Sequence, residues 1–404
     1  MKKLLLGLLV FTGVFALAAC GASDDTQGVY DDRVVVGNTA ATSGGFASVG
    51  VPFNAAMQAY FDMVNADGGI GGRQIEFIHY DDEFDGAQGL TNTQRLVEDD
   101  QVFALVGHFG TPTVGATYEY LNELGVPRVY YATGISQLFN PAADGGERFS
   151  FPVQPIFDAE GEVMVARAVA EYDAEKIGVI YTNADDGRGM LNGIELRAQA
   201  LGIELVTQQV APDANDMSSA ATALVSADVD AIIVAANQVP AEVAIKALYS
   251  ASSEAPIFTS YVNAAESFIA NLADEITSGQ FPIYSNAWVN IFNADGSFNA
   301  GYLLFAEQNP DYAANSFAMA GWIAAHFFVE GLRRVGDDEL TWDTYLEAME
   351  SAPVENPMGG IVDFADGRRA GTQSMALLQA TVDGETYVWA NHRAMEDIQA
   401  ILGN

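Results

Sequence analysis

Short apolar runs rich in β-branched residues alternate with helix-length amphipathic stretches along most of this chain, and no other feature restricts its fold as strongly. Residues 33–40 (RVVVGNTA) and 102–110 (VFALVGHFG) have the composition of buried strands. Residues 52–65 carry alanine, methionine, tyrosine and phenylalanine at helical spacing, and a glycine-rich turn follows them. Strands that alternate with helices over short loops predict a parallel α/β sheet.

The alternation begins a second time near residue 174, where a strand-like segment (AEKIGVIYTNADDG) precedes a helix-like one. A chain of 404 residues is also too long for one compact core. Three segments are candidate crossings between the halves: 148–157, 279–288 and 356–364. We therefore expect an α/β protein of two Rossmann-like lobes with parallel sheets, joined by three hinge crossings around a ligand cleft. The predicted boundaries place residues 33–152 and 285–357 in lobe one, and residues 153–284 and 358–404 in lobe two.

The N-terminus has the features of a secretory signal peptide, predicted over residues 1–19. Lys2 and Lys3 precede an apolar stretch that ends in small residues at Cys20, the only cysteine of the chain. The sequence LAACGAS resembles a bacterial lipobox, which implies cleavage before Cys20 and lipidation of its thiol, and so a membrane anchor. Cleavage near Ala19 by an ordinary signal peptidase is the alternative. Residues 20–32 are small, polar and acidic, as expected of a flexible tether.

The charge and the available side chains exclude several classes of function. With 17 basic and 54 acidic residues the net charge is −37, so the surface repels phosphate, and nucleic acid is not an expected partner. The four histidines have no metal-ligand spacing. The acidic segment 81–86 (DDEFDG) lacks the carboxylate that an EF-hand loop needs at its twelfth position, which is Asn92. Because no motif of a hydrolase or nucleotide-binding site is present either, we expect no metal, no cofactor and no enzymatic activity.

Five segments, in their order and spacing, resemble one protein family. They are GNTAATSGGFASVG (37–50), GGIGGRQIEFIHYDDE (68–83), RLVEDDQVFALVGHFGTPT (95–113), VPRVYYATGIS (126–136) and KIGVIYTNADDGRG (176–189). The chain is similar to the periplasmic solute-binding proteins of the leucine/isoleucine/valine type, which supply ABC importers. The resemblance implies the type I periplasmic binding protein fold, in which two lobes close around a small solute by bending at three hinge strands. It also implies a monomer that hands its solute to an ABC permease.

In this family, hydroxyl and backbone N–H groups after the third strand of lobe one hold the polar head of the solute. The resemblance assigns that role here to Thr111 and Thr113, assisted by Gly134 and Ser136 after the next strand. Free N–H groups at a helix N-terminus attract anions, which agrees with the assignment. The alternative is that the two threonines only cap a helix that begins near Val114. Two further contact candidates follow the first strand: Phe46 and Ser48.

Lobe two departs from the amino-acid-binding members of the family. Where they carry an aromatic residue before a glycine turn, this chain has Asp185 and Asp186. Where they carry an acidic residue for the solute ammonium, it has the neutral Tyr261 and Asn263. The group that binds the solute ammonium has therefore either moved to Asp185 or Asp186 or been lost. The alternative is that these two aspartates only form a solvated turn. Asn237 stands where another family aromatic faces the cleft, which suggests a polar or aromatic solute.

These features predict a lipid-anchored, extracytoplasmic solute-binding protein of an ABC importer. It would lie on the outer face of the cell membrane, or in the periplasm if the cell has two membranes. The expected solute is a small organic carboxylate, an amide or an amino acid. The alternative is an extracellular sensing domain that docks on a membrane signalling partner, because the same fold serves both purposes.

Overall fold

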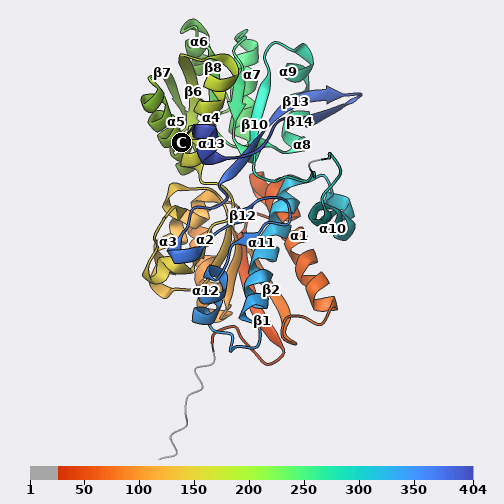
Figure 1. The fold of residues 1–404 in the computed structure, drawn as a ribbon. Coiled ribbons are helices and arrows are strands. Elements are labelled where there is room, and N and C mark those ends of the chain that lie inside the picture. The colour runs from red at the N-terminus through yellow and green to blue at the C-terminus, as the bar shows by residue number, and fades with distance from the viewer. Residues whose placement is uncertain (1–25, 294, 404) are drawn as a thin grey trace, which may run out of the picture.

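The chain forms two α/β lobes, which lie one above the other in Figure 1. The structure is a computed structural model that describes residues 26–293 and 295–403. The predicted signal peptide and Cys20 lie outside the described residues. Within the described ranges, no helix has both the length and the apolar character needed to cross a membrane.

Lobe one is built on a five-stranded parallel sheet. Its strands are β1 (Arg33–Ala40), β2 (Gln74–Asp81), β3 (Ala104–Phe109), β4 (Arg128–Ala132) and β5 (Ser150–Phe151), in the spatial order β2-β1-β3-β4-β5. Alternate residues of β1 point to opposite faces: Val34 and Val36 join the main core, whereas Val35 packs in a separate cluster with Leu121. The sheet is therefore buried on both faces, as a parallel sheet requires.

Helices cover both faces of this sheet. On one face, α1 (Ala47–Ala66) packs against α11 (Ser316–Val335), and α11 against α12 (Trp342–Glu350). A Cβ at Gly321 would lie 1.9 Å from the carbonyl oxygen of Phe53, so only glycine permits the close approach of α1 and α11. On the other face, α2 (Gly86–Gln94) packs against α3 (Thr111–Leu124). The short α10 (Ala300–Gln308) stands beside α1.

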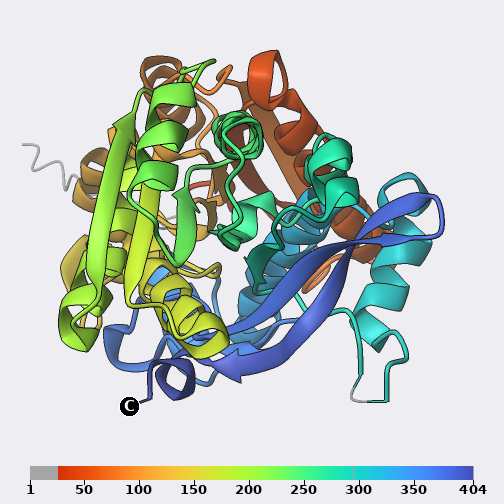
Figure 2. The same ribbon diagram turned by 90° about the horizontal axis from the view of Figure 1, so that it is seen from above.

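Lobe two holds a seven-stranded sheet in the order β14-β13-β10-β9-β8-β6-β7. Five strands are parallel, and β13 and β14 add an antiparallel hairpin at one edge, which the strand–helix alternation did not indicate. Figure 2 shows this hairpin extending away from the body of the lobe. The strands are β6 (Lys176–Thr182), β7 (Glu204–Val210), β8 (Ala231–Ala235), β9 (Ile257–Thr259), β10 (Ile283–Ala287), β13 (Ser374–Asp383) and β14 (Thr386–Asp397).

The helices of lobe two also form two layers. One layer packs α4 (Phe157–Tyr172) against α5 (Asp185–Leu201) and α13 (Ile398–Leu402), and the other packs α6 (Ser218–Ser226) against α7 (Val239–Ser250). The small helices α8 (Glu266–Ala270) and α9 (Ala273–Ser278) contact the hairpin strands. In β8, Ile233 packs in the α4–α5 layer, while Ile232 and Val234 pack in the α6–α7 layer.

The chain passes between the lobes three times. The first passage, residues 152–156, follows β5, and the second follows β10. The third follows a small hairpin of β11 (Val354–Glu355) and β12 (Ile361–Val362), stays beside lobe one as far as Arg369 and enters β13 at Ser374. Thr372 N donates to Val153 O at 2.7 Å, so the first and third passages run side by side.

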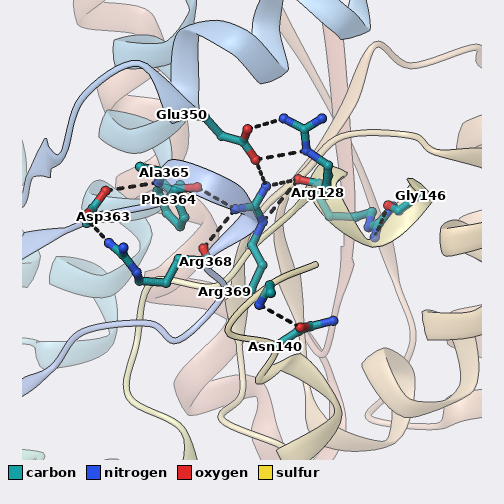
Figure 3. A network of polar contacts seen from close by, with 11 residues as sticks. Arg128, Asn140, Gly146, Glu350, Asp363, Phe364, Ala365, Arg368 and Arg369 are labelled. Atoms are coloured by element: carbon teal, nitrogen blue, oxygen red, sulfur yellow. Dashed lines mark hydrogen bonds and ion pairs between the residues drawn. The ribbon is translucent and has the colours of Figure 1, made fainter. Parts of the chain in front are cut away.

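A buried ion-pair network fixes the start of the third passage to lobe one (Figure 3). Arg369 is 1% exposed, pairs with Glu350 at 2.6 Å, and lies 4.8 Å over the ring of Phe151. Arg148 forms a second ion pair with Glu350. Burial acts to raise the pKa of Glu350, but hydrogen bonds from Arg148 and Arg369 outweigh it and hold this pKa below its usual value.

Candidate functional site

A cavity of about 1410 Å³ lies between the lobes and is lined by residues of both. The N-termini of α1, α3, α5 and α7 and the β13–β14 hairpin contribute to it, and much of the lining is apolar and aromatic. Among the described residues, its charged members are four acids and one base: Asp185, Asp186, Asp213, Glu266 and Arg188. The cavity therefore disfavours an isolated anion and favours a solute that carries a positive charge of its own.

In lobe one, the N-terminus of α3 presents polar groups to the cavity. α3 begins at Thr111, directly after Gly110, whose φ of 89° is one that glycine tolerates. Thr111 lines the cavity, and its Oγ1 lies 2.8 Å from Oγ1 of Thr133, another lining residue. The first backbone N–H groups of a helix have no partner within it, so this turn offers N–H and hydroxyl donors to a negative group.

The other predicted residues of lobe one stand in different places. Thr113 is fully buried and donates to Asp82 Oδ2 at 2.8 Å, so it supports the α3 N-terminus from inside lobe one and does not line the cavity. Ser136 is exposed outside the lining and donates to Asp158 Oδ2 on α4 at 2.5 Å, which links the two lobes. Ser48 is exposed and also outside the lining, where its neighbour Val49 takes part.

Gly134 and Phe46 complete the lobe-one predictions. Gly134 lies outside the lining at a close approach to the first passage: a Cβ there would lie 2.4 Å from Pro155 O and 2.7 Å from Tyr261 Oη. Its role in this structure is to let lobe two and the passage pack closely. Phe46 lines the cavity and stacks on Phe84, with ring centroids 3.7 Å apart and an interplanar angle of 12°.

In lobe two, the two predicted aspartates line the cavity at the N-terminus of α5 but differ in environment. Asp185 is exposed and forms an ion pair with Arg188 at 2.6 Å. Asp186 is partly buried, and its Oδ2 accepts a hydrogen bond from Asn237 Nδ2 at 2.8 Å. Burial raises the pKa of Asp186, because the ionised carboxyl group loses solvation there.

Asp186 and Asn237 together form an acceptor site. Asn237 lines the cavity, and its Oδ1 is buried without a hydrogen-bond partner among the described residues. A buried acceptor without a donor costs free energy, and so does a carboxylate that burial desolvates. Both costs are relieved by a ligand that brings hydrogen-bond donors and a positive charge.

The last two predicted residues have different roles: Tyr261 lines the cavity, and Asn263 supports a nearby turn. Tyr261 lines the cavity, and its Oη donates to Pro155 O at 2.9 Å in the first passage. Asn263 is fully buried outside the lining: Nδ2 donates to Ala236 O at 2.8 Å, and Oδ1 accepts from Gln238 N at 2.6 Å. Asn263 thus fixes the turn before α7, where Gln238 has a left-handed φ of 54°.

Glu160 is a residue that sequence reasoning missed. It lies on α4 and is fully buried, and it accepts hydrogen bonds from Tyr261 N at 2.7 Å and Ser260 Oγ at 2.8 Å, and from Asn286 Nδ2 at 3.3 Å. Burial raises the pKa of Glu160 to about 7, although these three hydrogen bonds act in the opposite direction. Its carboxyl group holds the turn that carries Tyr261. No sequence signal distinguishes it from the exposed acids of an amphipathic helix.

The sequence from residue 33 to residue 385 matches the family described as Periplasmic binding protein. The chain belongs to this family. It is a family of extracytoplasmic solute-binding proteins, not of enzymes. The predicted fold class is confirmed, since this type I periplasmic binding protein is an α/β protein with mainly parallel sheets.

Curated relatives cover part of the chain. An amino acid binding protein of Pseudomonas aeruginosa is 28% identical over 195 residues, which are 48% of this chain and 50% of that protein. A Leu/Ile/Val-binding protein homolog 2 of Brucella abortus is 26% identical over 170 residues, 42% of this chain and 44% of that protein. The match spans about half the length of these curated relatives.

Solved structures share the fold over nearly the whole chain. A fatty acid ABC transporter substrate-binding protein from Thermomonospora curvata superposes with a TM-score of 0.77 at 20% identity, covering 93% of this chain and 95% of that one. A branched chain amino acid ABC transporter protein from Thermus thermophilus with bound valine also has a TM-score of 0.77, at 17% identity, with coverage of 93% and 100%. At these identities the likeness shows the fold alone.

Proposed function

We propose that this protein is the solute-binding component of an ABC importer and that its solute is an amino acid, held as a zwitterion between the lobes. The observation that carries the proposal is the acceptor pair of Asp186 and Asn237 in the same cavity as the α3 N-terminus. The pair suits an ammonium group, and the helix N-terminus suits a carboxylate.

The two helix termini come from different lobes and approach each other. A Cβ built on Gly115 of α3 would lie 3.8 Å from Asp185 Oδ2 at the start of α5. A zwitterion with its carboxylate on α3 and its ammonium on Asp186 would therefore contact both lobes. Contacts with both lobes favour the closed state over the open one, which is how a binding protein signals occupancy to its partner.

Charge in the lining favours an amino acid over a simple carboxylic acid. The single basic group among the described lining residues, Arg188, is already paired with Asp185, and three further acids face the same space. A fatty acid, the solute named for the Thermomonospora curvata protein, would enter as an anion with no cation to meet it. The relative from Pseudomonas aeruginosa is named an amino acid binding protein, which agrees with the proposal.

The proposed setting is the outer face of a membrane. Lipidation of Cys20 would anchor the chain, and a monomer would deliver its solute to a permease. Of the predicted tether, residues 20–32, the part from Gln27 onward is bound to lobe one, where Gln27 Nε2 donates to Val97 O and Val102 O, so only the residues before it would serve as the tether. The anchor is tested by Cys20→Ser, which should release the protein from the detergent phase into the aqueous phase. Retention of the variant in the membrane fraction would refute lipidation at this residue.

A thermal-shift screen tests the solute class. Protein unfolded and refolded to strip carried-over ligand is screened with an amino acid series, each member beside its amide, its deaminated acid and its decarboxylated amine, because a ligand that binds the native state raises Tm. Amino acids should give the largest shifts. Asp186→Asn should abolish them, while the neighbouring Asp185→Asn, whose carboxylate is exposed and paired, should retain most of them. Equal shifts from the deaminated acids would refute the proposal.

A further inference from the structure

Six aromatic rings form a continuous wall on the lobe-one side of the cavity. In order they are Phe46, Phe84, Phe109, Phe53, Tyr130 and Trp288, which we call the aromatic wall. The centroids of successive rings are 3.7, 6.5, 5.6, 5.8 and 6.3 Å apart, and every ring belongs to the cavity lining. Phe46 and Phe84 are partly exposed, whereas the other four rings are at most 6% exposed and form the buried support behind them. Four of these separations lie within the roughly 4.5–7 Å that aromatic pairs prefer, and Phe46 and Phe84 stack more closely, so the rings hold each other in place.

Two residues with positive φ angles lie in the strands that carry part of this wall. Tyr130 has a left-handed φ of 63° within β4, and Gly107 has a φ of 67° in the adjacent β3. The strand register skips these two residues, pairing Val106 with Val129 and His108 with Tyr131. The register is the same on both sides of these residues, and a strained non-glycine residue such as Tyr130 persists where its surroundings fix it. A Cβ at Gly107 would lie 2.8 Å from Phe53 Cε1, so glycine leaves the space that this ring occupies.

Aromatic rings also line the cavity away from the wall. Phe157 and Tyr261 of lobe two stack at 5.8 Å with an interplanar angle of 22°. Phe292 and Phe298 stack at 5.1 Å and are 44% and 45% exposed, although both are lining residues. A ligand that covers these two rings would remove their apolar surface from water.

From these observations we propose that the solute carries a large aromatic body, of the size of an indole ring, which lies against the aromatic wall. This inference rests on the proposed function and narrows its solute to amino acids with aromatic side chains. A side chain as small as that of valine would leave most of the accessible aromatic surface of the lining uncovered, namely that of Phe46, Phe84, Phe292 and Phe298. A cavity of about 1410 Å³ also exceeds the roughly 300–1,000 Å³ of ordinary ligand pockets.

Calorimetric titration of the stripped mature protein with a head-group-matched series tests the inference. The probes are L-valine, L-leucine, 2-aminodecanoic acid, L-phenylalanine and L-tryptophan. L-Tryptophan should bind at least about tenfold more tightly than L-valine, and more tightly than the long-chain 2-aminodecanoic acid, because ring-to-ring contacts add to simple burial. Equal or tighter binding of L-valine or of the alkyl probe would overturn the inference.

A pair of variants tests whether the aromatic wall causes the preference for L-tryptophan. Phe84→Leu removes one ring of the wall at a partly exposed position, and it should weaken L-tryptophan roughly two- to tenfold while leaving L-leucine unchanged. Phe139→Leu is the matched control, because Phe139 is 53% exposed and lies outside the cavity lining. Equal weakening of both ligands by Phe84→Leu, or none of either, would contradict the role of the wall.

Two further probes separate this inference from the proposed function. Indole-3-propionate lacks the ammonium group and tryptamine lacks the carboxylate. If either binds as tightly as L-tryptophan, recognition of a zwitterionic head group is refuted, whereas binding of an aromatic body at the wall is not. Binding of none of the aromatic probes would overturn the inference, and if L-valine, L-leucine and 2-aminodecanoic acid also fail to bind, the proposed function is refuted with it.

Discussion

Replacing Glu160 with glutamine should remove a pH dependence of stability that originates behind the cavity. The carboxyl group is fully buried in lobe two and holds Tyr261 N and Ser260 Oγ. Burial raises its pKa from an ordinary 4.5 to about 7. Between these values the folded protein keeps a proton that the unfolded chain releases, so the folded state becomes less stable as pH rises from about 4.5 to about 7.

The size of the effect follows from the shift. A change from 4.5 to about 7 is worth roughly 3 kcal/mol once both states are ionised, at about 1.4 kcal/mol for each unit. Because Glu160 is buried, solvent screening does not reduce this figure as it would at a surface. The Glu160→Gln variant keeps the size and one carbonyl acceptor of the side chain but cannot ionise. Below pH 4.5 the two proteins should therefore differ little, and at pH 8 the variant should gain up to that amount relative to wild type.

The assay is urea unfolding of both proteins at intervals from pH 4 to pH 8, followed by circular dichroism. Many other carboxyl groups titrate in this range, but their contributions cancel in the difference between the two curves. The difference should grow between about pH 4.5 and 7 and then level off. A difference that stays flat across this range, or that grows in the opposite sense, would refute a raised pKa at Glu160.

Three further outcomes follow from the structure. Amino acid binding should weaken as pH falls through the raised pKa of Asp186, since protonation removes the charge that meets the ammonium; affinity unchanged down to pH 4 by calorimetry would argue against this partner. Gly134→Ala should destabilise the protein by more than about 1 kcal/mol, because its Cβ would lie 2.4 Å from Pro155 O; an unchanged Tm would contradict the close approach. Arg369→Met should lower the free energy of unfolding in urea by about 3 kcal/mol, because it leaves the buried Glu350 with one fewer partner. Arg368→Met breaks an exposed ion pair with Asp363 and should lower it by less than about 1 kcal/mol. Equal losses in the two variants would show that burial does not decide the cost.

Hydrophobic periodicity predicted the two lobes and their parallel strands. The buried runs of β1 and β3 and the restart of the pattern at β6 led directly to two parallel α/β lobes, because both faces of such sheets must be apolar. The hairpin of β13 and β14 escaped prediction, since its outer strand is largely solvent-facing and carries no buried run. The helix expected from near Val114 begins at Thr111, where glycine and proline set the first turn.

The site was predicted in part, because a polar residue after a strand has the same appearance whether it faces a ligand or its own backbone. Thr111 and Thr113 are two positions apart, yet one lines the cavity and the other binds Asp82 inside the lobe. Asn237 and Asn263 divide in the same way. Such choices depend on which direction each helix start faces, and this is settled by tertiary packing.

The aromatic wall could not be anticipated, for a related reason. Its members come from positions as far apart as Phe46 and Trp288, and each one alone reads as an ordinary core residue. Only the fold brings Phe84 onto Phe46 and places Tyr130 beside Phe53. The periodic pattern of one helix or strand does not indicate which side chains of distant elements will lie beside it.

The most direct test of the account is a crystal structure of the stripped protein with L-tryptophan bound. The ligand should lie between the lobes, with its ammonium group within hydrogen-bond distance of Asp186 and Asn237 Oδ1. The carboxylate should lie at the N-terminus of α3, and the indole ring should lie against the aromatic wall. A ligand that binds between the lobes with its ammonium away from Asp186, or that binds outside the cavity, would contradict the central claim.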